Sequence, residues 1–421
     1  MKVKVMGAAK EVGRSAFLVN CDHTNILMDY GVLLKREPIF PMHVKPKEVD
    51  AVVISHAHLD HSGFVPSLYL SGSTTNIPVL GTLPTFELSE LLIEDMIKLS
   101  GFYLPFEYLD LMTMLKSSKN LQYREPYMVN DAKVTLYESG HVVGGATTIV
   151  EHGGKKLFYT GDINTRGSKL LRPADLDFGE IDMMIIESTY SQNEQQPREE
   201  AEKDLMAFAN EVIERGGTLF IPSFSVERAQ EIACVLKAYN FKHKIVMDGM
   251  ALKANQIMGR HPAYLRDPEL FRKAVGEAEW IQGWNRRKKV VNEPCAIISP
   301  AGMLVGGSAI FYTQQIADSD KNGIALVSYQ GEGTPGRLLL DKKMANIDGK
   351  IKKCYADVKR FEFSGHNSRH ELFEILDRVK GNPKVLTVHG DGPSCVKFAE
   401  EIKEKYGFDA RAPDQGEIVD V

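Results

Sequence analysis

The chain of 421 residues is poor in cysteine and contains no pair in a C-x-x-C spacing. Its five cysteines are scattered singly along the sequence: Cys21, Cys234, Cys295, Cys354 and Cys395. An odd number of isolated cysteines argues against a disulfide framework and against a thiolate metal site. It is typical of proteins that work in a reducing compartment.

Long apolar runs are missing as well. The first residues, MKVKVMGAAKEVGRS, hold no apolar segment of the kind that a secretory signal needs. The longest uncharged stretch, Cys295–Ala317, has the length of a membrane span but contains Pro300, three glycines and several hydroxyl and amide side chains. This composition favours a buried strand followed by glycine loops. We therefore expect a cytoplasmic protein without a membrane partner.

Neither sign of charge is in large excess, because 51 Lys and Arg stand against 56 Asp and Glu, for a formal net charge of −5. Any affinity for nucleic acid must therefore come from a local groove rather than from the whole field of the protein. Hydrophobic residues make up 43% and charged residues 25%, which excludes disordered and collagen-like chains. At roughly 100–200 residues per domain, the length predicts two or three domains.

Short apolar runs alternate with amphipathic helical stretches along the chain. Predicted helices include Glu199–Arg215, Val226–Tyr239, His370–Val379 and a long helical insert at Glu87–Leu115. Predicted strands are Lys2–Met6, Asn25–Met28, Ala51–Ile54, Lys133–Leu136, Lys156–Tyr159, Asp182–Ile186, Thr218–Ile221, Lys244–Met247, Ala296–Ile298, Ile324–Val327 and Lys384–Val388. The alternation predicts α/β layers. The polar stretch Tyr190–Pro197 is interpreted as a crossing between two domains.

The segment VVISHAHLDHSG, residues 52–63, carries the strongest chemical pattern. Within six positions after an apolar strand it places His56, His58, Asp60 and His61, although the whole chain has only 12 histidines. Imidazole nitrogen and carboxylate oxygen are the ligands that zinc takes when no thiolate is present. His56 and His58 are alternate residues just past a strand end, so their side chains can point to one side. Asp60 and His61, one turn further on, can reach a neighbouring point, so the spacing suits two adjacent metals.

Further histidines and aspartates stand where other apolar runs end. They are Asp29 in NILMDYG, His141 in ESGHVVGGA, Asp162 in KLFYTGD and His389 in KVLTVHG. Strand ends are the usual location of functional groups in α/β folds. Taken alone, a strand-end aspartate is more often a turn residue or a helix cap, and a lone histidine is more often a surface residue or a satisfied core residue. Their significance is that they complete a ligand set which the first motif leaves short.

Together these residues resemble the metallo-β-lactamase superfamily, and more narrowly its β-CASP nuclease branch, over essentially the entire chain. HAHLDH matches the superfamily signature, and His141 and Asp162 match the ligand positions that follow it. Three branch motifs are matched by Glu187 in MMIIEST, His366 in FEFSGHNS and His389 in LTVHGDG. PSFSVERAQE and SPAGMLVGG support the match, with Glu227 where the family usually has glycine. Among RNase J-like and CPSF-like ribonucleases, the archaeal CPSF-like type is most similar, and we expect no KH domains.

The resemblance implies an α/β fold: a four-layer αββα metallo-β-lactamase domain at residues 1–189 and 361–421, with an inserted α/β β-CASP domain at 190–360. It also implies two Zn²⁺ ions per chain. One would be held by His56, His58, His141 and Asp162, and the other by Asp60, His61, His389 and the bridging Asp162. Asp29 would orient the ligands through hydrogen bonds. Glu187, His366 and Asp60 would be catalytic, with His366 as the acid that protonates the leaving oxygen.

The implied function is a zinc-dependent ribonuclease that hydrolyses single-stranded RNA, as an endonuclease, a 5′-to-3′ exonuclease or both. Histidine at position 389 favours RNA over DNA, because DNA-directed relatives carry an apolar residue there. Candidate RNA or phosphate contacts are Arg228, Arg337, Ser364, Gly365 and Ser368, while Trp284–Lys289 (WNRRKK) is either a backbone contact or a solvated basic face.

Two alternatives stay open, a catalytically silent RNA-binding subunit of a processing complex and a small-molecule hydrolase of thioesters or lactams. By analogy, we also expect a homodimer.

Overall fold

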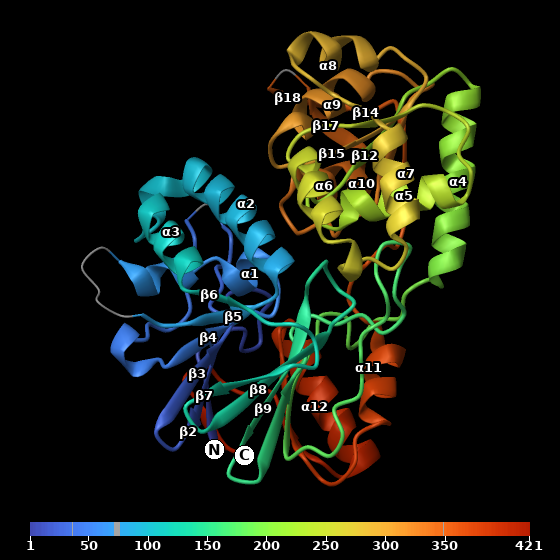
Figure 1. Ribbon diagram of the computed structural model, residues 1–421. Helices are drawn as coiled ribbons and strands as arrows, with labels where there is room; N and C mark the ends of the chain where they lie inside the picture. The colour runs from blue at the N-terminus through green and yellow to red at the C-terminus, as the bar shows by residue number, and fades with distance from the viewer. Residues whose placement is uncertain (36, 71–75, 348) are drawn as a thin grey trace. The chain divides into compact units, whose positions relative to one another are not determined.

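The computed structural model describes residues 1–35, 37–70, 76–347 and 349–421 (Figure 1). The chain forms two compact units. Unit 1 comprises Met1–Gly167, Pro173–Glu194 and Gly365–Val421, and unit 2 comprises Ser168–Arg172 and Gln195–Ser364. The domain boundaries expected from the sequence, at 189/190 and 360/361, stay a prediction.

Unit 1 contains two seven-stranded sheets. The first sheet has, in spatial order, β22 (Ile418–Asp420), β1 (Lys2–Val5), β2 (Phe17–Cys21), β3 (Thr24–Met28), β4 (Ala51–Val53), β5 (Val79–Gly81) and β6 (Ser118–Asn120). The second sheet has β21 (Asp409–Arg411), β20 (Lys384–Val388), β11 (Met183–Glu187), β10 (Lys155–Tyr159), β9 (Ala146–His152), β8 (Ala132–Glu138) and β7 (Pro126–Val129).

The two sheets pack face to face because alternate residues of their strands are apolar. Val3 and Val5 of β1 and Met183 and Ile185 of β11, for example, belong to one buried cluster between the sheets. The outer face of the first sheet packs against α2 (Leu83–Ser100) and α3 (Tyr108–Lys116). That of the second sheet packs against α11 (Arg369–Leu376) and α12 (Gly392–Tyr406). The predicted four-layer αββα architecture is therefore confirmed (Figure 1).

Unit 2 is built on a parallel six-stranded sheet. Its order is β14 (Glu279–Trp280), β13 (Ile245–Met247), β15 (Ala296–Ser299), β12 (Leu219–Pro222), β16 (Gly323–Leu326) and β19 (Asp357–Arg360). Its helices are α4 (Arg198–Glu214), α5 (Arg228–Ala238), α6 (Ala251–Arg260), α7 (Pro268–Glu277), α8 (Trp284–Val290), α9 (Ser308–Ile316) and α10 (Pro335–Lys342). A hairpin of β17 (Met344–Ile347) and β18 (Lys350–Lys353) follows α10. This unit is α/β, as predicted.

Each apolar run predicted as a strand forms one, with ends within two residues of the prediction. The helical insert Glu87–Leu115 is divided between α2 and α3, because Gly101 and Pro105 lie where the helix stops. The prediction of a strand and glycine loops over Cys295–Ala317 was wrong in its second half. There the chain forms α9 directly after Gly307.

The functional residues lie at one kind of strand end. In the first sheet β3 and β4 are parallel, so their carboxyl ends share one edge. In the second sheet β10, β11 and β20 are parallel, and β8 runs in the same direction as β10 because both are antiparallel to β9. The segments that leave these six strands carry every ligand position expected from the sequence.

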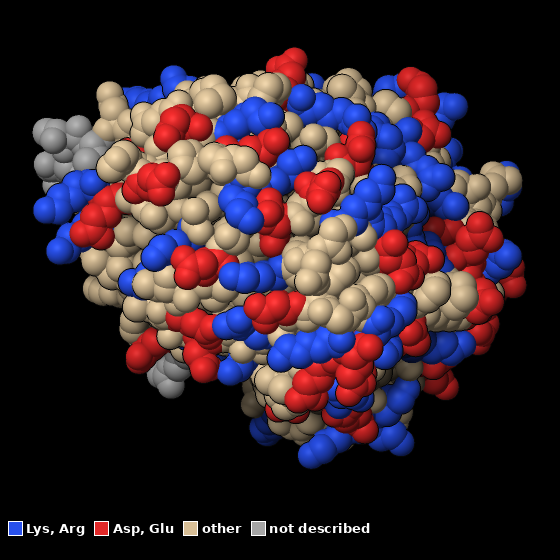
Figure 2. All heavy atoms as spheres, turned by 90° about the horizontal axis from the view of Figure 1, so that it is seen from below, with Lys and Arg blue, Asp and Glu red and all other residues tan. Residues whose placement is uncertain are grey.

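Acidic and basic side chains are interspersed over the face of the molecule shown in Figure 2. On that face no broad area of a single sign is seen, in keeping with the small net charge. An electrostatic attraction for a polyanion must therefore come from smaller surfaces.

Candidate metal centre

The HAHLDH segment is held in a tight turn after β4. His56 and His58 precede the short helix α1 (Leu59–Ser62), which carries Asp60 and His61. Gly31 makes this turn possible, since a Cβ atom at Gly31 would lie 1.8 Å from the carbonyl oxygen of Asp60. Only glycine allows the two backbone segments to approach so closely.

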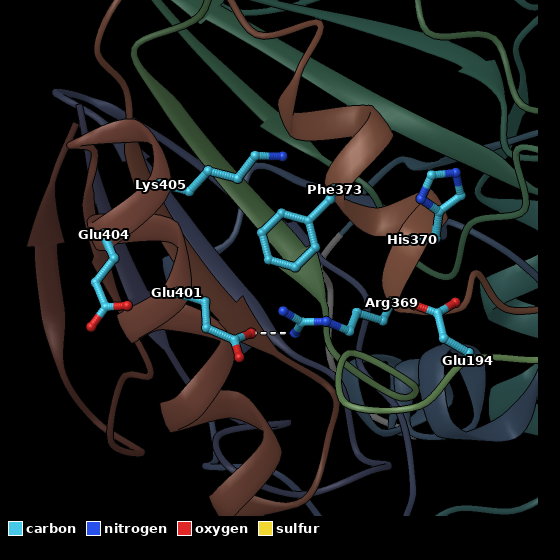
Figure 3. A pocket seen from close by; sticks show the side chains of 7 residues that line it. All are labelled: Glu194, Arg369, His370, Phe373, Glu401, Glu404 and Lys405. Carbon is cyan, nitrogen blue, oxygen red and sulfur yellow. Dashed lines mark hydrogen bonds and ion pairs between the residues drawn. The ribbon is translucent and has the colours of Figure 1, made fainter.

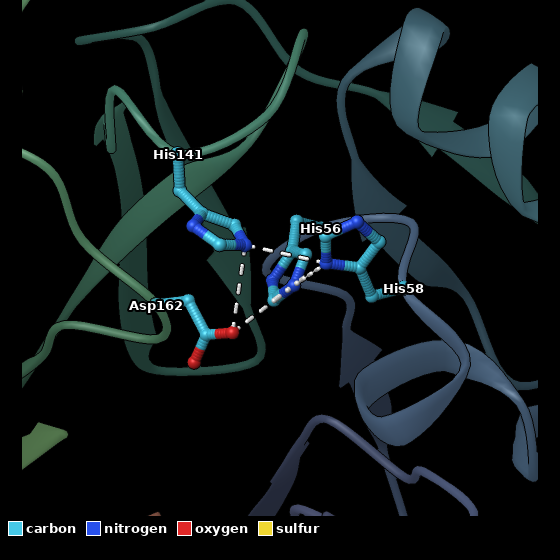
Figure 4. Close-up of side chains that lie close together, drawn as sticks. All are labelled: His56, His58, His141 and Asp162. Atoms are coloured by element: carbon cyan, nitrogen blue, oxygen red, sulfur yellow. Dashed lines mark hydrogen bonds and ion pairs between the residues drawn. The ribbon is translucent and has the colours of Figure 1, made fainter. Parts of the chain in front are cut away.

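A first group of possible metal ligands consists of His56, His58, His141 and Asp162 (Figure 4). Nδ1 of His58 lies 3.1 Å from Nε2 of His56 and 3.2 Å from Nε2 of His141. Oδ2 of Asp162 lies 3.5 Å from Nε2 of His56 and 3.6 Å from Nε2 of His141. Figure 4 shows the three rings and the carboxylate pointing toward one another.

The tautomers of two of these rings follow from their outer hydrogen bonds. Nδ1 of His141 lies 2.8 Å from the carbonyl oxygen of Gly365, which can only accept, so this nitrogen carries the proton. Nδ1 of His56 lies 3.0 Å from the hydroxyl oxygen of Ser55, whose own proton goes to Asp29. Both Nε2 atoms therefore present lone pairs to the interior of the group. Buried lone pairs that converge beside a carboxylate are the donor set of a cation site.

A second group consists of Asp60, His61, Asp162 and His389. Oδ1 of Asp162 lies 3.3 Å from Nε2 of His61 and 3.2 Å from Nδ1 of His389. Oδ2 of Asp60 lies 3.2 Å from Nε2 of His389. Asp162 thus turns one carboxylate oxygen toward each group, and its buried Oδ1 receives no well-aligned hydrogen bond from the described residues. An unsatisfied buried carboxylate oxygen is costly unless a cation compensates it.

Asp29 fixes the orientation of His61 in the second group. Its carboxylate lies 2.7 Å from Nδ1 of His61 and accepts hydrogen bonds from the backbone N–H and hydroxyl of Ser55 and from the hydroxyl of Tyr159. Because Nδ1 of His61 is engaged by Asp29, Nε2 of that ring is left to face Asp162.

Burial and neighbouring charges prepare these groups for a cation. Burial and His61 lower the pKa of His56, and burial and His366 lower the pKa of His141, so both rings favour the neutral form that binds metals. Burial raises the pKa of the Asp162 carboxyl, but His389 and His61 lower it by more, so it stays ionised. Burial lowers the pKa of His61, but the surrounding aspartates raise it well above its ordinary value. The site therefore has an excess of negative charge.

Glu187 and His366 form a pair at the edge of the two groups. Nδ1 of His366 lies 2.9 and 3.0 Å from the two carboxylate oxygens of Glu187, and its Nε2 lies 3.9 Å from Oδ2 of Asp162. Burial lowers the pKa of His366, but Glu187 and Asp162 raise it by more, to about 9. The imidazole is therefore cationic at neutral pH, and its Nε2 side faces the ligand groups.

Three family models match successive parts of the chain. A metallo-beta-lactamase superfamily domain matches residues 18–190, a Beta-Casp domain matches residues 229–339, and a Zn-dependent metallo-hydrolase RNA specificity domain matches residues 353–413.

Curated relatives match over nearly the whole chain. RNase aCSPSF2 of Saccharolobus solfataricus is 36% identical over 99% of this chain and 85% of its own length. Probable RNase MJ4 of Methanocaldococcus jannaschii is 32% identical over 100% of both chains. Transcription termination factor FttA of the same organism is 35% identical over 96% of this chain and 69% of its own.

The chain belongs to the β-CASP family of the metallo-β-lactamase superfamily. A crystal structure of a protein of unknown function from Enterococcus faecalis shares the fold, with a TM-score of 0.63 over 99% of both chains at 14% identity. The superfamily is metal-dependent, and the two ligand groups that share Asp162 are the candidate metal site of this β-CASP protein.

The expected RNA contacts of the β-CASP protein have varied surroundings. In unit 2, Arg228 is buried and its Nη2 pairs with Glu227 at 3.2 Å, while Nε and Nη1 have no hydrogen-bond partner among the described residues. Arg337, in contrast, is exposed and pairs with Asp341 at 2.7 Å. The Ser364 carbonyl accepts a hydrogen bond from Arg198.

Two other expected RNA contacts have structural partners in unit 1. The carbonyl oxygen of Gly365 faces His141, and the hydroxyl of Ser368 bonds to Glu371 in the capping box that begins α11. Their contacts with RNA stay predictions.

Sequence reasoning missed three residues that support the centre. Tyr159 and Ser55 both donate hydrogen bonds to Asp29, and Asn367 accepts two from Thr165, which ties the loop of His366 to the loop of Asp162. Tyr159 had a detectable signal: it ends an apolar strand, and a buried tyrosine hydroxyl requires a partner. The amide Asn367 lies next to His366 but had no such signal.

A separate cavity of about 500 Å³ in unit 1 takes no part in the centre (Figure 3). It is lined by Glu194, Arg369, His370, Phe373, Glu401, Glu404 and Lys405. Arg369 pairs with Glu401 across it, as Figure 3 shows, and its walls carry both signs of charge. Its lining includes none of the metal-ligand candidates.

Among the residues that the structure describes, no helix combines the length and the apolar composition needed to cross a membrane.

Proposed function

We propose that the protein is a zinc-dependent ribonuclease that hydrolyses phosphodiester bonds of single-stranded RNA, internally, from the 5′ end or both. The observation that carries the proposal is Asp162, whose two oxygens face two groups of histidine and aspartate ligands, and whose buried Oδ1 receives no well-aligned hydrogen bond from the described residues. Nitrogen and oxygen donors without thiolate suit zinc. The names of the relatives as RNases and the RNA specificity domain support RNA as the substrate class.

The donor atoms fit two zinc ions. His56, His58, His141 and Asp162 would hold one, and Asp60, His61, His389 and Asp162 the other. Two zinc ions, when bound, lower the pKa of a water molecule and stabilise the negative charge that builds on the phosphate during hydrolysis. Asp29 keeps His61 in the tautomer that presents Nε2. The Gly365 carbonyl does the same for His141.

The leaving ribose oxygen needs a proton, and His366 is the group positioned to give it. Glu187 binds Nδ1 of this ring with both carboxylate oxygens, and Nε2, the nitrogen that would donate the proton, is on the side of the ligand groups, 3.9 Å from Oδ2 of Asp162. Glu187 is itself fixed, because Oε1 also accepts a hydrogen bond from the backbone N–H of Ile163, the residue after Asp162. The pair of Glu187 and His366 is thus attached to the loop that carries Asp162.

Arg228 supports the binding of a phosphate backbone in unit 2. A buried guanidinium with two unpartnered N–H directions is costly, and a phosphate oxygen is a ligand that would satisfy both. Arg337, Ser364, Gly365 and Ser368 complete the proposed contacts. We further propose that unit 1 is the metallo-β-lactamase domain and unit 2 the β-CASP domain, and that the protein works in the cytoplasm as a homodimer.

The test is incubation of the purified protein with end-labelled single-stranded RNA and the matching DNA, with and without a chelator. We expect chelator-sensitive cleavage of RNA, with 5′-phosphate and 3′-hydroxyl products. A circular RNA separates the modes, since only an endonuclease can open it, and a comparison of 5′-monophosphate and 5′-triphosphate RNAs detects dependence on the end.

Two other outcomes would replace this proposal. RNA binding without cleavage, with fewer than two zinc ions per chain by metal analysis, would identify a silent RNA-binding subunit. Chelator-sensitive hydrolysis of thioesters or lactams, without any action on RNA, would identify a small-molecule hydrolase.

A further inference from the structure

The short helix α8 of unit 2, labelled in Figure 1, carries an aromatic ring among cations. Trp284 is 48% exposed. The guanidinium of Arg287 and the ammonium of Lys288 each lie 5.5 Å from the centroid of its ring. These residues share one face because they are three and four positions apart on a helix. An exposed aromatic ring flanked by cations is the kind of surface on which nucleobases stack.

Two arginines of α8 are neutralised by carboxylates. Arg286 binds Glu279 and Glu293, and the same two carboxylates bind Lys244, so this quartet has no net charge. Arg287 binds Asp248 through two hydrogen bonds of 2.6 and 2.8 Å.

Two lysines of α8 remain without such compensation. Lys288 and Lys289 are exposed, and within the described part of the chain no carboxylate forms an ion pair with either. The helix therefore offers a local surplus of positive charge beside the indole.

The aromatic ring is held in place by its neighbours. Trp284 packs against Phe311 of α9 with ring centroids 4.7 Å apart. Arg287, which lies over the indole, is anchored to the buried Asp248, and Asp248 also accepts a hydrogen bond from Tyr312 at 2.7 Å. Since these contacts restrict the side chains before any partner arrives, little conformational entropy is lost on binding.

We propose that Trp284, Lys288 and Lys289, together the α8 surface, bind single-stranded RNA. A nucleobase stacks on the exposed indole, and the two lysines contact flanking phosphates. Stacking on an aromatic ring beside cations is sequence-tolerant, because every base has a π face. The proposal rests on the proposed ribonuclease function and adds to it a surface whose residues contribute to neither metal-ligand group.

The test measures binding of a fluorescent single-stranded 20-mer RNA to the full chain in a His366→Ala background, which limits cleavage. Trp284→Ala is expected to weaken binding about 5- to 150-fold, since one base–aromatic stack contributes about 1–3 kcal/mol. Trp284→Phe, which keeps a ring, should retain most of the affinity. Asn285→Ala, an exposed neutral neighbour on the same helix, is the matched control and should bind like the parent.

The charge contribution is tested with the double variant Lys288→Ala/Lys289→Ala. Loss of two phosphate contacts should reduce the slope of log affinity against log salt by about 1.4, at about 0.7 per contact on a single strand. Unchanged affinity in Trp284→Ala, or Trp284→Phe as weak as Trp284→Ala, would overturn the proposal. If the protein binds polyglutamate in a manner that depends on Trp284 and does not bind RNA, the surface would be assigned to an acidic protein instead.

Hydrolysis of the small diester bis(p-nitrophenyl) phosphate separates this inference from the proposed function. Trp284→Ala in the otherwise unchanged protein should hydrolyse this diester at the wild-type rate, because Trp284 belongs to neither metal-ligand group and the diester offers no RNA strand to the α8 surface. If the wild type shows no chelator-sensitive cleavage of RNA, the ribonuclease proposal fails, whatever the binding variants show.

Discussion

Asp162 is the residue on which the proposed chemistry depends most. Its carboxylate contacts ligands of both groups, although the ligands of the two groups come from four separate segments of unit 1. If Asp162 served only the group of His56, its Oδ1 would stay buried without a well-aligned hydrogen bond from the described residues, whereas serving both groups would satisfy both oxygens. One short side chain after β10 therefore determines whether the site holds one ion or two.

Replacing His366 by Ala is expected to lower the turnover of RNA by about 10²- to 10⁴-fold, the usual contribution of general acid catalysis, while the zinc content is unchanged. The imidazole of His366 belongs neither to the ligand group of His56 nor to that of His61, so its removal leaves both ligand sets intact. Kinetics and metal analysis on the same preparation check this. His370→Ala, an exposed histidine four residues further on, is the control.

A contrary result would be informative. Loss of zinc in His366→Ala would make the residue a ligand together with Asp162 and Glu187, a third combination that the distances permit. The acid would then have to be sought elsewhere.

Asp29→Asn is expected to weaken zinc binding about 10- to 100-fold, the usual effect of losing a partner that orients a ligand. The substitution removes the charge that holds His61 and keeps the left-handed backbone, with φ of 56°, which asparagine tolerates. Competition with a chromogenic chelator measures the affinity. Asp22→Asn is a matched control, because Asp22 has φ of 55° but lies at the surface beside His152. Equal affinities of wild type and Asp29→Asn would exclude an orienting role.

At the scale of elements, the site is produced by strand direction. Five parallel or co-directional strand ends, together with the loop before α11, deliver the ligands and the Glu187–His366 pair to one place. The α8 surface depends in the same way on β13 and β14, because Asp248 follows β13 and Glu279 begins β14. These carboxylates fix the arginines of α8 and leave its lysines exposed.

The ion-paired residues Arg286, Lys244, Glu279 and Glu293 are expected to make a pH-dependent contribution to the stability of unit 2. Arg286 lowers the pKa of both Glu279 and Glu293 to about 2, with Lys244 adding to the effect. A carboxyl with a depressed folded-state pKa stabilises above its unfolded value of about 4.3 and loses that contribution as the pH falls toward 2. The Tm difference between wild type and Arg286→Ala should therefore be largest above pH 5 and shrink toward pH 2.

Calorimetry from pH 2 to 6 measures this difference. The control is Arg272→Ala, which removes a fully exposed pair with Glu269 on α7 and should shift Tm little at any pH. A difference for Arg286→Ala that grows as the pH falls would contradict the assignment.

At the scale of the whole molecule, the proposed zinc ions stabilise the fold that binds them. Asp29, Asp60, Asp162 and Glu187 bring four carboxylates into one region of unit 1, and the buried Oδ1 of Asp162 receives no well-aligned hydrogen bond from the described residues. A ligand that binds only the folded state adds about 2.7 kcal/mol at a hundredfold excess over its Kd. A chelator should therefore lower the Tm of unit 1, and added zinc should restore it.

The Asp162→Asn variant sharpens this experiment. It replaces the carboxylate that is proposed to serve both ions by an amide of nearly the same size, so the zinc-dependent rise in Tm should fall strongly or disappear. A rise in Tm as large as that of the wild type would mean that Asp162 does not bridge.

Much of the fold was predictable because its signals are local. The apolar runs of β4 or β11 define strands by residue type and length alone, and His56 and His58 fall directly after one of them. Less was predictable where a helix lacks a periodic apolar stripe. The missed helix α9 mixes Ser308, Thr313 and glutamines with its apolar residues, so its sequence is also compatible with loops.

The sequence by itself determined which side-chain atoms are available for chemistry and which strand ends carry them. Both follow from the types of a few neighbouring residues. Only the tertiary structure decided which of those atoms meet. The pairing of Glu187 with His366, the contact of Gly365 with His141, and the two-sided placement of Asp162 each join segments that are distant in the chain. Such contacts depend on the register and packing of whole sheets, which no short stretch of sequence specifies.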